Sequence, residues 1–139
     1  MDERIVKLLK KMHLASVCAI DDEGQPYAFS AFYAFDEVNF CLLLASCDES
    51  SHVKFLKNSK LVAGTVALDT KIVGKIEGVQ FQGVMREAST SEREIYFKRF
   101  FYAKAMDPKI WSISLEKIKF TSNTLGFGKK IKWERGDKI

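Results

Sequence analysis

The feature that most constrains the fold is a succession of short strand patterns separated by polar turns. Apolar or alternating runs fall at residues 14–20, 27–35, 38–45, 61–68, 77–88, 111–120 and 125–133. The turn at 21–26 is rich in Asp and contains Gly and Pro, which predicts a β-hairpin. Many short strands with tight turns favour a barrel over a doubly wound sheet. The sequence therefore predicts a mainly β, six- to seven-stranded antiparallel barrel.

Three helices interrupt this series of strands. Residues 2–12 place apolar side chains at helical spacing, from Ile5 to Met12. A second helix is predicted at about 50–58 behind a Ser cap. A third is predicted at about 91–104, where Ser-Glu-Arg-Glu at 91–94 matches a capping box. No change in composition marks a boundary, and 139 residues match the size of one domain. We therefore expect one domain over residues 1–139.

The run at 111–120 changes its phase part-way along. Apolar residues alternate in one phase up to Leu115 and in the other phase from Ile118 onward. A switch of phase inside one strand indicates an extra residue on one side of a ladder. We therefore predict a bulge or bend near Glu116 and Lys117.

Positive charge is concentrated in the second half of the chain. Residues 1–70 carry seven basic and ten acidic side chains, whereas residues 71–139 carry fifteen and eight. A basic half can attract a phosphate, a nucleic acid or a membrane surface. Nucleic acid could be bound by the basic tail and its aromatic residues, namely Lys129, Lys130, Lys132, Arg135, Phe127 and Trp133. Because the tail alternates basic and apolar residues as a core strand does, this alternative is less favoured.

The cysteines and the N-terminus indicate an intracellular protein. Cys18, Cys41 and Cys47 are odd in number and lack CxxC spacing, so we expect free thiols, with at least Cys18 and Cys41 buried in strands. The first twelve residues lack a signal-peptide core, and no stretch is long and apolar enough to span a bilayer. We therefore expect a cytoplasmic protein without a membrane partner.

A polar turn between a strand and a helix is the strongest candidate for anion binding. The strand ends at Ser46, and Ser50, Ser51 and His52 begin the predicted helix. The first N–H groups of a helix lack partners and carry partial positive charge, so they favour an anion. A plain Ser cap beside a surface His is the simpler alternative.

The same stretch resembles the pyridoxamine 5′-phosphate oxidase-like FMN split-barrel superfamily. Ser46, Ser50, His52 and Asn58 match that family's strand-end hydroxyl, its Ser-x-cation pair and the Asn that closes the helix. The opening hairpin, the strand Gly78-Val79-Gln80-Phe81-Gln82-Gly83 and the tail at 123–130 are similar to a small, functionally uncharacterised bacterial branch. Residues 27–34 hold no cation, unlike the oxidase, so the phosphate would depend on hydroxyls, backbone N–H groups and His52.

The resemblance implies a bound FMN at the interface of a homodimer. The phosphate would contact Ser46, Ser50, Ser51 and His52, and the ring would lie toward a second group of residues: Phe29, Ser30, Thr65, Gln80 and Gln82. An amide both donates and accepts hydrogen bonds, which suits the mixed edge of the isoalloxazine ring. Trp111 and Trp133 could pack against the flavin ring, although a core or interface role is more common for Trp.

The expected function is that of an FMN-dependent oxidoreductase acting on an unknown small molecule. A flavin carries the redox chemistry itself, and no side chain stands out as an acid, base or nucleophile, so no catalytic residue is assigned. No zinc-hydrolase, P-loop or nucleophile-elbow motif is present, and no metal site is expected. The open alternatives are a flavin-binding sensor or carrier without turnover and a haem-binding split barrel, for which His13 and His52 are the available imidazoles.

Overall fold

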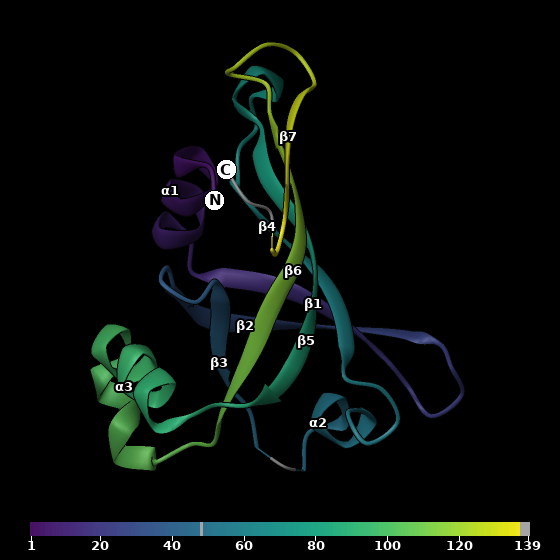
Figure 1. Cartoon of the computed structure of the whole chain (residues 1–139), viewed down its shortest axis with the longest axis vertical. Helices are drawn as coiled ribbons and strands as arrows, with labels where there is room; N and C mark the ends of the chain where they lie inside the picture. The colour runs from purple at the N-terminus through teal and green to yellow at the C-terminus, as the bar shows by residue number, and fades with distance from the viewer. Residues whose placement is uncertain (48, 137–139) are drawn as a thin grey trace.

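The arrangement of the strands and helices is shown in Figure 1, a computed structural model that describes residues 1–47 and 49–136. The strands are β1 (Leu14–Ile20), β2 (Pro26–Asp36), β3 (Cys41–Ala45), β4 (Leu61–Ala67), β5 (Glu77–Glu87), β6 (Ile110–Ser122) and β7 (Lys129–Glu134). The helices are α1 (Glu3–Lys11), α2 (Ser51–Phe55) and α3 (Thr90–Arg99), with short 3₁₀ helices η1 (Val73–Lys75) and η2 (Phe101–Met106).

The strands form one antiparallel sheet that closes on itself. Their order is β3-β2-β1-β4-β5-β6-β7, and β3 also pairs with β6. That last pairing closes six strands into a barrel and leaves β7 as an additional strand beyond β6. The first part of β6 pairs with β3, and the part after the bulge pairs with β7. The predicted barrel is therefore confirmed: among the described residues, six strands close the barrel and β7 extends the sheet beyond β6.

A bulge in β6 lets both halves of that strand bury their apolar residues. Gln82 is opposite Lys117, but the next residue, Gly83, is opposite Leu115. Glu116 is therefore the extra residue of the bulge, with no residue of β5 directly opposite it. A Cβ atom at Gly83 would lie 2.5 Å from a backbone oxygen of Ser114, which explains why glycine is required beside the bulge. The bulge predicted from the change of phase is confirmed.

Two apolar clusters hold the barrel together. The larger cluster fills the interior, and α1 contributes Ile5, Leu8 and Leu9 to it. The buried Tyr33 hydroxyl donates to the Leu9 carbonyl at 2.7 Å, which fixes α1 against β2. The smaller cluster packs α3 and the residue after it against the outside of β2, β3 and β6. Because both faces of β3 are covered, Cys41 to Leu44 are all buried.

The helix boundaries differ in detail from those expected. The predicted helix at 50–58 has a shorter α-helical part, Ser51–Phe55, followed by turns. The predicted helix at 91–104 is divided into α3 and η2. The capping box uses Ser89 and Glu92 rather than residues 91–94, because Glu92 also binds Arg86 and Ser112.

The predicted strand at 38–45 begins only at Cys41. The buried Asp36 accepts hydrogen bonds from the backbone N–H groups of Val38 and Asn39, and residues 37–40 therefore form a turn. Arg135, just after β7, donates to the carbonyls of Asn39 and Phe40. These bonds attach the end of β7 to the turn between β2 and β3.

Candidate functional site

A row of polar side chains crosses the outward face of the sheet. Strand pairing places six residues side by side in the order Ser30, Ser16, Thr65, Gln80, Lys119 and Lys132. Their sequence neighbours Val17, Val79 and Phe120 are buried, so alternation directs this row away from the core. The row runs from hydroxyls on β2, β1 and β4, through an amide on β5, to ammonium groups on β6 and β7.

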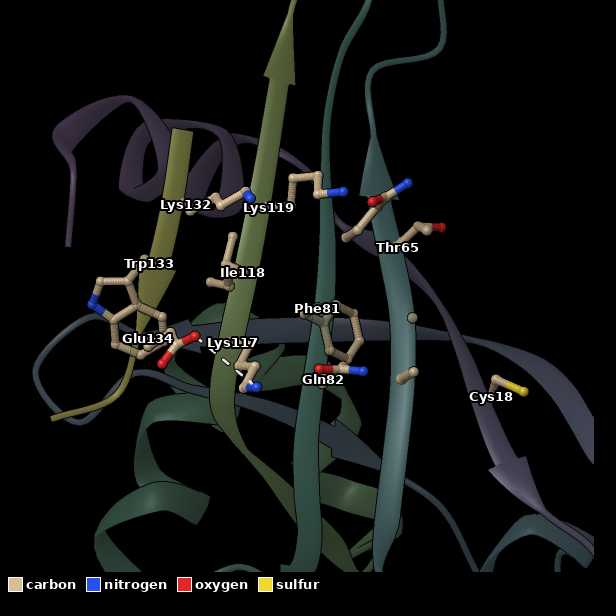
Figure 2. A pocket seen from close by; sticks show the side chains of 13 residues that line it. Cys18, Thr65, Phe81, Gln82, Lys117, Ile118, Lys119, Lys132, Trp133 and Glu134 are labelled. Atoms are coloured by element: carbon tan, nitrogen blue, oxygen red, sulfur yellow. Dashed lines mark ion pairs between the residues drawn. The ribbon is translucent and has the colours of Figure 1, made fainter. Parts of the chain in front are cut away.

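A hollow of about 550 Å³ lies over this part of the sheet. Residues of β1, β4, β5, β6 and β7 line it (Figure 2). Small residues such as Cys18 and Ala63 leave space on one side, while Thr65, Gln80 and Gln82 supply neutral hydrogen-bonding groups. A concave surface with a few convergent polar groups is typical of a small-molecule site.

The structure separates the predicted site residues into two groups. Thr65, Gln80 and Gln82 line the hollow, and Ser30 belongs to the same outward row. Phe29 is opposite Val17, which is buried, so its side chain lies on the inner face. Phe29 and Ser30 are adjacent in β2, and their side chains therefore point to opposite faces of the sheet.

The second group surrounds His52 near the start of α2. The imidazole stacks on the Phe29 ring, with the ring centroids 3.7 Å apart. The His52 Nε2 atom lies 2.5 Å from the Ser46 hydroxyl oxygen, and Trp111 donates its indole N–H to the Ser46 carbonyl at 3.1 Å. Burial lowers the pKa of His52, so the neutral imidazole is favoured at neutral pH. A bound anion would instead raise the pKa of His52, because it favours the charged imidazolium.

The hydroxyls of Ser50 and Ser51 differ in what they contact. Ser50 takes the cap position of α2, but its side chain makes no capping hydrogen bond, and its oxygen lies 3.3 Å from the Cys47 sulfur. Ser51 is exposed. This turn therefore offers hydroxyl donors next to the Ser46–His52 pair.

Three lysines of the hollow were not among the residues predicted to bind the flavin, and Lys132 was named only in the nucleic-acid alternative. Lys117 and Lys119 lie on β6, and Lys132 lies on β7 directly opposite Lys119. Their sequence signal is an alternation of Lys with apolar residues, which predicts strands with one basic face. Only the pairing of β6 with β7 shows that the two basic faces coincide.

The tryptophans, cysteines and metal-binding groups are distributed as follows. Trp111 and Trp133 both pack against the interior cluster. The three cysteines are free thiols, as predicted, but Cys18 is only half-buried on the outward face, because alternation directs Val17 and Ala19 inward instead. Among residues 1–47 and 49–136, no group of His, Cys, Asp or Glu could hold a metal ion, and no helix could span a membrane.

Comparison with known proteins assigns the chain to a family. The UPF0306 protein YhbP of Salmonella schwarzengrund is 41% identical over 135 residues, which cover 94% of this chain and 91% of that protein. The chain belongs to the UPF0306 YhbP family. No protein-family model matches it.

Solved structures similar to this UPF0306 member share its fold at low sequence identity. A haem-binding protein from Mycobacterium smegmatis has a TM-score of 0.75 and 13% identity, over 92% of this chain and 56% of that protein. A FAD-binding protein from Mesorhizobium loti has a TM-score of 0.69 and 14% identity, over 85% of this chain and 91% of that protein. These similarities confirm the split-barrel fold.

Proposed function

We propose that this protein binds FMN as a member of the pyridoxamine 5′-phosphate oxidase-like superfamily and acts as an oxidoreductase on a small molecule. The split-barrel fold and the resemblance at residues 46–58 support the superfamily. The FAD-binding protein from M. loti supports a flavin, because it has the same fold. FMN would supply the redox chemistry, while the chain would bind and orient the ring.

The observation that carries this proposal is the hollow on the outward face of β4 and β5. Thr65, Gln80 and Gln82 present one hydroxyl and two amides on neighbouring strands, and all three side chains are exposed. A flavin ring has hydrogen-bond donors and acceptors along one edge, and amides can pair with both kinds. The strands are a rigid support, which favours a fixed ring orientation.

Haem is the second candidate, because the M. smegmatis protein binds it on the same fold. Haem iron is usually held by an axial side chain, most often His. Neither histidine lines the hollow: His13 is exposed just before β1, and His52 contacts Ser46 and Phe29. Within one copy, the hollow therefore offers no imidazole to a haem iron.

The separation of the two groups of site residues supports a site shared by two copies of the chain. We propose that the turn with Ser46, Ser50, Ser51 and His52 binds the phosphate, while the hollow of a partner copy binds the ring. Leu14 and Phe32 are opposite each other on the outward face and are 51% and 60% exposed. A partner copy would cover this apolar pair.

The absorption spectrum of the purified protein and an FMN titration test the proposal. Flavin absorption bands support it, and a Soret band without flavin bands contradicts it. The replacement of both Gln80 and Gln82 by Ala should weaken FMN binding by about tenfold, since two ring contacts would be lost. The matched control is Gln25→Ala, which changes an exposed amide in the β1–β2 turn. If the double variant and the control bind FMN as tightly as the wild type, the hollow does not bind the ring.

A further inference from the structure

We propose that Lys119 and Lys132 form an oxyanion subsite that binds the carboxylate or phosphate group of the substrate. The inference depends on the proposed function only in calling this ligand a substrate. The two lysines are cross-strand partners on β6 and β7, and both line the hollow. In Figure 2 they lie at one end of the hollow, and Lys117 and Glu134 lie at the other.

The placement of these lysines is unfavourable unless an anion is present. Directly opposed residues in an antiparallel pair have Cβ atoms about 4.5–5.5 Å apart, and like charges at such positions destabilise the pair. Neutral residues alternating with apolar ones would form the same ladder without this repulsion. Strand pairing does not require two ammonium groups here, and an anion bound in the hollow would relieve their repulsion.

The acidic residues of the neighbouring strands do not neutralise the pair. Each of the four on β5, β6 and β7 has another partner: Glu77 with Ser122 and Thr124, Glu87 with Lys109, Glu116 with Arg135, and Glu134 with Lys117. In the part of the chain that the structure describes, no carboxylate lies within ion-pair distance of Lys119 or Lys132. The pair therefore keeps its positive charge available to a ligand.

The position of the pair limits the size of the ligand. Gln80 is the neighbour of Lys119 on β5, and Lys132 lies one strand further. Strands are about 4.8 Å apart, so an oxyanion between the lysines would lie roughly 5–10 Å from the Gln80 side. This distance limits the length of the ligand, and the geometry therefore selects a small acid whose other end reaches the Gln80 side of the hollow.

The subsite is tested first on the protein without flavin, by two-dimensional NMR at constant ionic strength. Inorganic phosphate and benzoate are the two probes, which separate phosphate from carboxylate recognition. We expect saturable shifts of the Lys119, Lys132 and Gln80 amide signals with at least one probe. The double variant Lys119→Gln/Lys132→Gln should bind that probe at least tenfold more weakly. A control with the same change of charge, Lys7→Gln/Lys11→Gln on the exposed side of α1, should stay within twofold of the wild type.

Several outcomes would overturn the subsite. It is wrong if neither probe gives saturable shifts, or if the double variant and the control lose affinity equally. Retained signal dispersion in the double variant shows that it is folded. Because these titrations contain no flavin, a failure of the FMN titration refutes the proposed function and leaves the subsite standing.

A second measurement distinguishes a substrate from the flavin itself. FMN and riboflavin are titrated into the wild type and the Lys119→Gln/Lys132→Gln variant. We expect both affinities to stay within twofold of the wild type, because the pair is reserved for another molecule. If FMN binds tenfold more weakly to the variant and riboflavin does not, the lysines bind the phosphate of the cofactor and the substrate assignment is wrong.

Discussion

The buried carboxylate of Glu92 should make the stability of this protein depend strongly on pH in the acid range. Glu92 is 4% exposed. Its oxygens accept from two nitrogens of Arg86 at 2.7 and 3.1 Å, from the Ser89 backbone at 2.9 Å and from the Ser112 hydroxyl at 2.7 Å. Burial alone would raise the pKa, but these hydrogen bonds outweigh it and lower the pKa of Glu92 from 4.5 to about 2.

The magnitude follows from the linkage between proton binding and folding. A tenfold change in a proton-binding constant is about 1.4 kcal/mol, so this lowering of the pKa corresponds to about 3 kcal/mol. Since the folded pKa lies below the unfolded one, the unfolded state binds more protons between pH 4.5 and about 2. The contribution of Glu92 is therefore complete above that range and is lost as the pH falls through it.

Urea unfolding across this pH range, in the wild type and in Glu92→Gln, measures the effect. The amide keeps the shape and can still accept in the capping box, but it has no charge. We expect the variant to be less stable by about 3 kcal/mol at neutral pH, and the difference to disappear near pH 2. The control Glu94→Gln changes an exposed carboxylate on the same helix. If Glu92→Gln loses stability in parallel with the wild type at every pH, the stabilising role of the charge is refuted.

Three further predictions follow from the same structure. His52→Ala should weaken FMN binding about tenfold in a fluorescence titration, since about 1.4 kcal/mol of contacts would be lost; equal dissociation constants, or an equal loss in His13→Ala, would exclude this role. Gly64→Ala should destabilise the protein by about 1–3 kcal/mol in urea unfolding, because the new Cβ would clash with the backbone oxygen of Ser16 and overpacking costs that much. Gly74→Ala, which has open space, should be near neutral. Sedimentation should give a homodimer, and a monomer at micromolar concentration would contradict the shared site.

Much of the barrel could be predicted because alternation is a local property. The strand at 14–20 has the predicted bounds, and the change of phase located the bulge at Glu116. The capping box was harder, because Ser89 with Glu92 and Ser91 with Glu94 both match the same pattern. The structure uses Glu92 because its carboxylate also reaches Arg86, which lies on β5. That contact crosses elements, and local pattern cannot reveal it.

The residues of the candidate site were predictable where alternation within a single strand decides which face a side chain points to. Alternation placed Gln80 and Gln82 outward, as the structure has them. The same alternation separates Phe29 from Ser30, which the family resemblance had grouped together. The pairing of Lys119 with Lys132 depends on the register between β6 and β7. No residue pattern within either strand specifies that register.

The closure of the barrel through β3 and β6 sets the order of events during synthesis. β3 pairs with residues that are made much later, since Ala45 is opposite Ile110. At 5–20 residues per second, the ribosome needs roughly 3–13 s to produce that partner. During this interval one edge of an entirely apolar strand has no partner, and such edges promote aggregation. A nascent chain that stops before Ile110 therefore leaves this edge of β3 unpaired, whereas in the completed chain β6 pairs with the edge and closes the barrel.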